Sequence, residues 1–190
     1  MFAYYARYSI HHIKGVAANE MIRESLFADV VLTDGNLSFA DNDGWPSAFV
    51  KELLENAKCP VIVTPFQFDE IDEIVFAYDG TDSSIFAIKQ FIYLFPEFSE
   101  IKITLLQVLS DEDDDITEKE KLKELLMRHY DTVHYDTLQG NAEIELFKKF
   151  LTQKNKLLVI GAYGRKKIFG HSTADILLKT TDLAIFITHY

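Results

Sequence analysis

The fold is indicated first by residues 73–84, which read Glu-Ile-Val-Phe-Ala-Tyr-Asp-Gly-Thr-Asp-Ser-Ser. The apolar run at the start is typical of a parallel strand that is buried on both faces. An Asp-Gly pair ends the run as a turn. Ser83 or Ser84 is suited to cap a helix that we expect to stop at Pro96. This stretch therefore predicts a strand, a turn and a helix, as at the start of a β-α-β unit.

Short apolar strands and amphipathic helices alternate from there to the C-terminus. Further strands are predicted at residues 101–109, 133–138, 156–160 and 183–188, and further helices at a Thr117–Glu120 capping box, after residues 140–142, and at 173–179. The weaker, alternating pattern of the strand at 133–138 suits a sheet edge. This order predicts an α/β fold with an open, doubly wound parallel sheet that is covered on both faces. Ligands of such sheets bind beyond the carboxyl ends of the strands, where the strand order reverses.

The first 70 residues repeat the last part of this pattern. Three stretches match in the same order at similar intervals, residues 14–17 with 139–142, 28–33 with 155–160, and 60–64 with 184–188. Such a match predicts an internal repeat, so we divide the chain into a partial unit with its linker, residues 1–69, and a complete domain, residues 70–190. The partial unit would supply strands at about residues 6–12, 30–33 and 61–64. Either its missing half has been lost, or it packs on the complete domain or on a second chain.

The composition describes an acidic globular chain of 190 residues, with 48% hydrophobic residues and a formal net charge of −11. A negative field of this kind repels nucleic acid and anionic membranes, so we expect neither as a partner. No apolar run reaches the ~20 residues of a membrane span, and the N-terminus lacks a signal-peptide pattern. The single cysteine, Cys59, excludes an internal disulfide. We expect a cytoplasmic protein, and neither the scattered histidines nor the acidic run at 111–115 predicts a metal site.

The segment after the fourth strand of the complete domain contains the residues best suited to bind a ligand. Gly161 and Gly164 allow the backbone to turn sharply and to approach a ligand closely. Ser172 and Thr173 offer hydroxyl and N–H groups to a phosphate at a predicted helix start, and Arg165 adds positive charge. An ordinary turn with a serine cap and a solvated basic loop explains the same residues. The spacing alone leaves both interpretations open.

Motifs in both predicted parts of the chain resemble those of the universal stress protein family. They lie at residues 77–83, 106–108, 140–142, 161–165 and 184–189, with further family-like phrases at 24–29 and 58–63. The resemblance implies the strand order 3-2-1-4-5 for the complete domain. It also implies a regulatory role in the stress response and non-catalytic binding of ATP or AMP. It implies no metal beyond a magnesium ion carried by the nucleotide. It also implies a homodimer that pairs through the C-terminal strand, residues 184–189.

The resemblance also assigns the nucleotide contacts. Relatives that bind ATP use an acidic residue after the first strand, the end of the second strand, and a loop of the form G-x2-G-x9-G-[S/T] after the fourth. Mapped onto this sequence, the contacts are Asp79 and Gly80 for the ribose or adenine, Val108 for the adenine, and Gly161, Gly164, Arg165, Gly170, Ser172 and Thr173 for the turn and the phosphates. The loop departs from the family pattern, because it is shorter and His171 stands beside Gly170.

Three functions therefore remain open. The first is a nucleotide-binding regulatory protein, and the second is a structural or dimerisation module without a ligand. The third is an enzyme of the ATP-pyrophosphatase class, whose S-G-G-x-D-S turn resembles residues 79–83. Asp79 disfavours this third function, because a carboxylate there opposes the charge of a triphosphate. In the N-terminal part Asp34 stands where the repeat has Gly161, so we predict no nucleotide site in residues 1–65.

Overall fold

The computed structural model describes residues 7–39, 44, 46–65, 70–109, 118–161, 177–179, 181 and 183–188. The strands are β1 (Val31–Asp34), β2 (Val61–Thr64), β3 (Glu73–Tyr78), β4 (Lys102–Leu109), β5 (Val133–Gln139), β6 (Lys156–Gly161) and β7 (Ala184–Thr188). The α-helices are α1 (Ala17–Glu24), α2 (Ala48–Asn56), α3 (Asp82–Leu94), α4 (Lys119–Met127) and α5 (Ala142–Phe150), with short 3-10 turns η1 (Ser25–Phe27) and η2 (Pro96–Glu100). Residues 177–179 are also helical.

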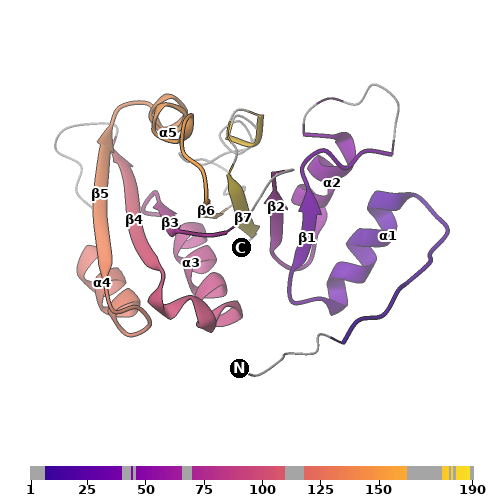
Figure 1. Ribbon diagram of the computed structural model, residues 1–190, viewed down its shortest axis with the longest axis horizontal. Coiled ribbons are helices and arrows are strands. Elements are labelled where there is room, and N and C mark those ends of the chain that lie inside the picture. Colours follow the sequence, from indigo (N-terminus) through magenta and orange to yellow (C-terminus); the bar gives the residue numbers. More distant parts are fainter. Residues whose placement is uncertain are drawn as a thin grey trace.

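All seven strands form one sheet in the order β1-β2-β7-β6-β3-β4-β5 (Figure 1). Numbered within the complete domain, the strands β3 to β7 follow the order 3-2-1-4-5, which confirms the predicted α/β topology. The edge position predicted for residues 133–138 is also confirmed, because β5 is the last strand of the sheet. The whole sheet is larger than predicted, since β2 and β1 extend it beyond β7.

The sheet is covered on both faces (Figure 1). On one face α3 and α4 pack on the central strands, with Phe91 and Leu126 in one apolar cluster with Phe76. The second cluster lies on the other face and contains side chains from α1, α2, α5 and residues 177–178. Alternate residues of β3 enter the two clusters, Val75 the second and Phe76 the first, as side chains of a strand must. Both faces of β3 are therefore buried.

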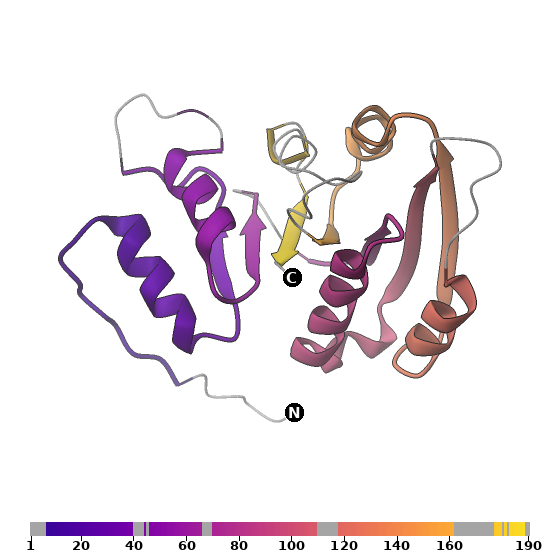
Figure 2. The ribbon, with the colours of Figure 1, turned by 180° about the vertical axis from the view of Figure 1, so that it is seen from behind.

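In the two matching parts of the sequence, the helices begin and the strands end at matching residues. The helices α1 and α5 start at Ala17 and Ala142, β1 and β6 end at Asp34 and Gly161, and β2 and β7 end at Thr64 and Thr188. Strand β2 pairs with β7 in antiparallel fashion, seen from behind in Figure 2, and the register is centred on Ile62 and Phe186. These two residues are matched in the sequence repeat. Residues 61–64 thus pair with the last strand of residues 70–190, as in one of the open alternatives.

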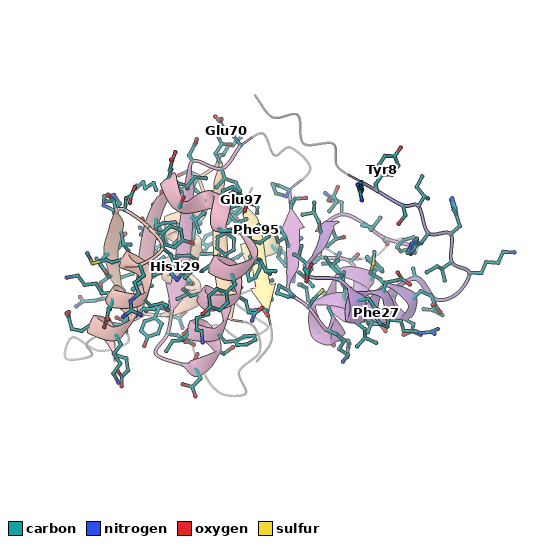
Figure 3. The ribbon with its side chains drawn as sticks, turned by 90° about the horizontal axis from the view of Figure 1, so that it is seen from below. Tyr8, Phe27, Glu70, Phe95, Glu97 and His129 are labelled. Atoms are coloured by element: carbon teal, nitrogen blue, oxygen red, sulfur yellow. The ribbon has the colours of Figure 1, made fainter. Side chains whose placement is uncertain are left out.

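One predicted strand is wrong. Residues 7–14 form no strand, and Tyr8 and Ile10 are 86% and 70% exposed (Figure 3 labels Tyr8). This segment matches β5, which is held in the sheet by its parallel neighbour β4. Among the described residues, no strand lies beside this segment to pair with it. A strand needs such a neighbour because its N–H and C=O groups must otherwise bond to water.

Two helix starts differ from the prediction. Helix α3 is capped by Thr81, whose side chain accepts a hydrogen bond from the Ser84 N–H at 3.3 Å, and not by Ser83 or Ser84. Both serines lie inside the first turn of the helix. For α4 the N-cap is Glu118, which makes no side-chain cap bond. The predicted partner Thr117 lies outside the described residues, as does most of the helix expected at 173–179.

Candidate functional site

The site predicted from the sequence lies where the carboxyl ends of β3, β4 and β6 meet. Tyr78 pairs with Gln107 of β4, so Asp79 and Val108 follow side by side. The parallel register of β3 with β6 brings the end of β3 beside Gly161. The strand order reverses between β3 and β6, since the chain leaves β3 in one direction and returns through β6 to the other side. This is the position at which open parallel sheets bind ligands.

The turn after β3 is held by its own side chains. Gly80 has φ +77°, a conformation that favours glycine. One oxygen of the half-buried Asp79, Oδ1, accepts hydrogen bonds from the Thr81 N–H at 3.0 Å and from the Thr81 hydroxyl at 2.5 Å. The Thr81 oxygen in turn accepts the Ser84 N–H. The turn therefore links the predicted ligand residue Asp79 to the N-terminus of α3.

Gly161 makes a close approach to the first turn of α3. A Cβ atom at Gly161 would lie 2.5 Å from the backbone C and O of Ser83 and 2.8 Å from its Oγ. These distances are well below van der Waals contact, so a larger residue would force β6 and α3 apart. From the sequence we expected this glycine to let the backbone approach a ligand, and that role stays a prediction. Among the described residues Gly161 also packs against the first turn of α3, a role that spacing alone did not reveal.

The burial of two polar side chains near this edge was not expected from the sequence. Ser83 is 8% exposed, and its Oγ has no hydrogen-bond partner within the described residues. The same holds for Oε1 of the buried Gln107. Burial raises the pKa of the Tyr78 hydroxyl, and the negative charges of Asp79 and other nearby carboxylates raise it further. The sequence signal that could have indicated these two residues is a polar residue inside an apolar strand or shortly after one. Such groups are costly to bury without partners, so their presence there points to a specific role.

Five of the predicted contact residues cannot be placed. Gly164, Arg165, Gly170, Ser172 and Thr173 lie outside the described residues, so their roles stay predictions. The backbone of Val108 is described as part of β4, paired with Leu138 of β5. Of the predicted set, the structure thus brings Asp79, Gly80, Val108 and Gly161 to one edge of the sheet.

The turn after β1 resembles the turn after β3. Asp34 Oδ1 accepts hydrogen bonds from the Asn36 N–H at 2.7 Å and from its side-chain Nδ2 at 3.2 Å. No helix starts at this turn, because α2 begins only at Ala48 and is capped by Ser47. The Asp34 turn therefore has the aspartate and its hydrogen bonds but lacks the helix N-terminus of the Asp79 turn.

The opposite, amino-terminal edge of the sheet holds a buried ionic cluster. Glu73 is 6% exposed; its Oε1 accepts the Thr104 hydroxyl at 2.5 Å and lies 3.2 Å from the Lys102 Nζ, and its Oε2 accepts from the Lys156 Nζ. Burial acts to raise the pKa of Glu73, but the hydrogen bonds from Lys156, Thr104 and Lys102 outweigh it and lower this pKa to about 2. The cluster joins the starts of β3, β4 and β6, far from the carboxyl edge, and we assign it a structural role.

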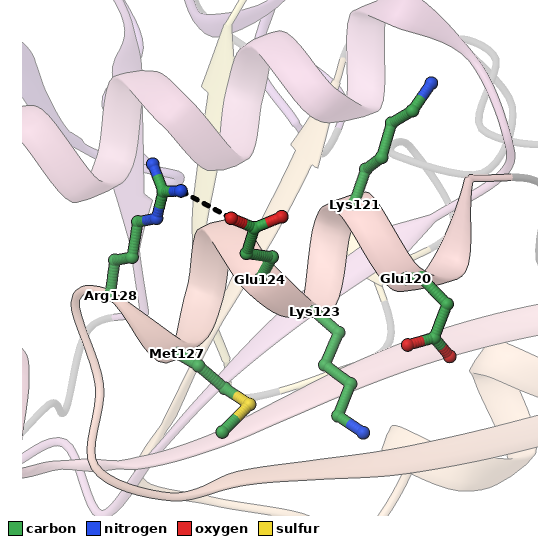
Figure 4. Close-up of a pocket in the computed structure, with 6 residues that line it drawn as sticks. All are labelled: Glu120, Lys121, Lys123, Glu124, Met127 and Arg128. Atoms are coloured by element: carbon green, nitrogen blue, oxygen red, sulfur yellow. Dashed lines mark hydrogen bonds and ion pairs between the residues drawn. The ribbon is translucent and has the colours of Figure 1, made fainter.

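A separate pocket of about 480 Å³ lies along the exposed side of α4 (Figure 4). Its lining residues are Glu120, Lys121, Lys123, Glu124, Met127 and Arg128, and Glu124 pairs with Arg128. All of them belong to one helix and its end, and none belongs to the predicted site. The described part of the chain contains no group of three His, Cys, Asp or Glu side chains arranged to hold a metal ion. No helix within it is long and apolar enough to cross a membrane.

The comparison with known sequences finds one informative relative. No protein-family model matches the chain. A universal stress protein of Synechocystis sp. is 26% identical to it over 144 residues. The match covers 73% of this chain and 50% of that protein, so the chain spans about half the length of the curated relative it matches.

Solved structures share the fold. A universal stress protein from Archaeoglobus fulgidus superposes with a TM-score of 0.65 at 15% identity, over 90% of this chain and 64% of that one. A protein of unknown function from Pseudomonas aeruginosa superposes with a TM-score of 0.56 at 12% identity, over 93% of this chain and 69% of that one. The sequence match to the Synechocystis protein and the motifs quoted above support membership of the universal stress protein family, and the solved structures show the same fold.

Proposed function

We propose that the chain is a regulatory protein of the stress response that binds ATP or AMP without catalysing a reaction. The observation that carries the proposal is the arrangement at the end of β3. There the Asp79 carboxylate, which is held by hydrogen bonds from Thr81, lies beside the N-terminus of α3 at the point where the strand order reverses. Helix N-termini favour anions. The buried Ser83 hydroxyl, which has no hydrogen-bond partner among the described residues, adds a polar group that a ligand or water would satisfy.

The proposed contacts follow the family resemblance. Asp79 and Gly80 would meet the ribose or adenine, and Val108 would line the adenine. The turn and the phosphates would be held by Gly161, Gly164, Arg165, Gly170, Ser172 and Thr173, with magnesium arriving only on the nucleotide. Binding without chemistry is favoured over the ATP-pyrophosphatase alternative, because the Asp79 carboxylate stands where that class places an uncharged Ser-Gly turn.

Calorimetric titration with ATP and with AMP tests this proposal. We expect heat of binding with the wild type, and a loss of at least about tenfold in affinity for Asp79→Ala, because a hydrogen bond to a charged group is removed. Gly164→Arg should abolish binding. The matched control is Asp34→Ala, at the similar turn in the N-terminal part, which should bind like the wild type. Flat wild-type titrations with both nucleotides would overturn the proposal. Pyrophosphate release from ATP would favour the enzyme instead.

We also propose that residues 1–69 are a partial repeat of the domain formed by residues 70–190. The support is the coincidence of element boundaries and the strand pairing centred on the matched residues Ile62 and Phe186. Deletion of residues 1–69 would expose the edge of β7, and we expect the shortened chain to dimerise through that edge. Sedimentation velocity measures this, and a stable monomer would contradict it.

The homodimer and the cytoplasmic location remain proposals based on the family resemblance. In the whole chain both edges of β7 are already paired, one with β6 and one with β2. A homodimer of the whole chain would therefore use another surface than residues 184–189. A ligand-free structural module remains the second candidate function, and the titrations above distinguish it.

A further inference from the structure

Three of the hydrogen bonds of Thr81 link Asp79 to the start of α3. Its N–H and its hydroxyl both donate to Asp79 Oδ1, at 3.0 and 2.5 Å, and its oxygen accepts the Ser84 N–H at 3.3 Å. A hydroxyl has one proton and two lone pairs, so it can hold the aspartate and cap the helix at the same time. The conformation of Asp79 is thereby coupled to the start of α3.

This arrangement leaves the second oxygen of Asp79 available. Within the described residues Oδ2 has no hydrogen-bond partner, while Oδ1 has two from Thr81. The side chain is half-buried, at the carboxyl edge where β3 and β6 diverge. An acceptor held in one orientation before binding loses less conformational entropy when a ligand arrives. A hydroxyl or amine of the ligand would therefore bind it more tightly than it would bind a freely rotating aspartate.

We propose that Thr81 is a positioning residue of the nucleotide site, which acts by holding Asp79 in the orientation that accepts a hydrogen bond from the ligand. This inference rests on the proposed function. Nothing in the family motif mapped above assigns a role to Thr81. The Asp34 turn is the internal comparison: Asn36 holds Asp34 through its N–H and its amide group, but no helix is capped there.

The first measurement needs no nucleotide. Three-bond couplings of the Asp79 β-protons, measured by NMR, report whether χ1 has one value or averages over several rotamers. We expect one value in the wild type and in Thr81→Ser, which keeps the hydroxyl, and averaging in Thr81→Ala. A single, unchanged rotamer in Thr81→Ala would overturn the proposal, because the hydroxyl would then not hold the carboxylate.

The second measurement is nucleotide affinity in a double-mutant cycle. We expect Thr81→Ala to weaken ATP binding about five- to tenfold and Thr81→Ser to restore it within about twofold. In an Asp79→Ala background, Thr81→Ala should have no further effect, since its influence passes through Asp79. An equal loss in that background would show that Thr81 only caps α3, and would overturn the proposal.

The two measurements separate the failure of this inference from that of the proposed function. A wild type that binds neither ATP nor AMP overturns the nucleotide site, and the role of Thr81 in it falls as well. The NMR result then still shows whether the hydroxyl holds Asp79. A wild type that binds, with Thr81→Ala unchanged in affinity, overturns the positioning role alone. Thermal unfolding of each variant measures the separate effect of losing the helix cap, which we expect as a lower Tm.

Discussion

Leu32 in β1 and Val159 in β6 occupy matching positions of the two parts of the chain, yet their surroundings are opposite. Val159 is completely buried, whereas Leu32 is 66% exposed. Val159 lies in the cluster beneath α3 and α4, and β6 has β3 as its neighbour. Strand β1 is the edge of the sheet, with no strand beyond it. The difference teaches that the burial of a strand residue is decided by the neighbouring elements and not by its own apolar character.

The last residues of the same two strands show a second difference. Gly161 ends β6 directly against Ser83, where no Cβ fits, whereas β1 ends in Asp34, which carries a full side chain. Among the described residues, no helix begins at the Asp34 turn in the way that α3 begins beside Gly161. A glycine is therefore required in one half of the molecule and dispensable in the other.

The largest effect is expected from Gly161→Ala. Because the added Cβ would meet backbone atoms at 2.5 Å, we expect the free energy of unfolding to fall by about 3 kcal/mol, the upper end of the usual cost of overpacking. The matched change Asp34→Ala should cost less than about 1 kcal/mol, since only turn hydrogen bonds are lost. Urea unfolding of both variants measures the difference. Equal losses would mean that Gly161 does not contact α3 as described.

A somewhat smaller effect is expected from Val159→Ala. Removal of two buried methyl groups from the cluster beneath α3 should lower the free energy of unfolding by about 2.5 kcal/mol. Leu32→Ala, although it removes more atoms, should change it by less than about 0.5 kcal/mol, because the side chain is already in water. Denaturant unfolding decides the point. A loss at Leu32 as large as that at Val159 would indicate that a partner covers β1 in solution.

The smallest of the three effects is expected at the amino-terminal edge. Lys156 of β6 pairs with Glu73, whereas the matching residue in the sequence repeat is the exposed Asp29, two residues before β1. Glu73→Gln should lower the free energy of unfolding at pH 7 by about 2 kcal/mol, because it removes a buried charge from its partners, and Asp29→Asn should leave it nearly unchanged.

The pH dependence sharpens the same prediction. The folded state lowers the pKa of Glu73 from 4.5 to about 2, so its contribution to stability is fully present above about pH 4.5 and is lost as the pH falls toward 2. The difference in unfolding free energy between the wild type and Glu73→Gln should therefore shrink over this window. A difference that stays constant from pH 7 to pH 3 would contradict the role given to Lys156 and Thr104.

Much of the fold could be predicted from local patterns. The run of apolar residues at 73–78 and the Asp-Gly pair after it are sufficient for β3 and its turn, since both depend on neighbours in the chain. The strand expected at 6–12 was wrong because strand formation depends on a distant partner. The cap of α3 was placed at the serines, whereas Thr81 takes that role because it also binds Asp79.

The residues of the candidate site also fall into two groups, those that could be found from the sequence and those that could not. Asp79, Gly80 and Gly161 could be found from sequence, because turn residues after apolar strands mark the carboxyl edge of a parallel sheet. The buried polar groups of Ser83 and Gln107 could not be found from the sequence. They lack partners among the described residues because of how β3, β4, β6 and α3 pack together. Two aromatic side chains show the same dependence on neighbouring elements. The ring centroids of Phe95 and Phe91 are 5.0 Å apart near β7, whereas Phe27, in the N-terminal part, is 93% exposed (Figure 3).

The sequence by itself determined the alternation of strands and helices and the turn residues of the candidate site. Periodicity and turn chemistry act over a few residues, so they can be recognised without knowing what lies across the sheet. Only the tertiary structure decided that β2 pairs with β7, that Gly161 faces Ser83, and that Leu32 stays exposed while Val159 is buried. Each of these depends on which distant element is present to form hydrogen bonds or exclude water, and local sequence does not contain that information.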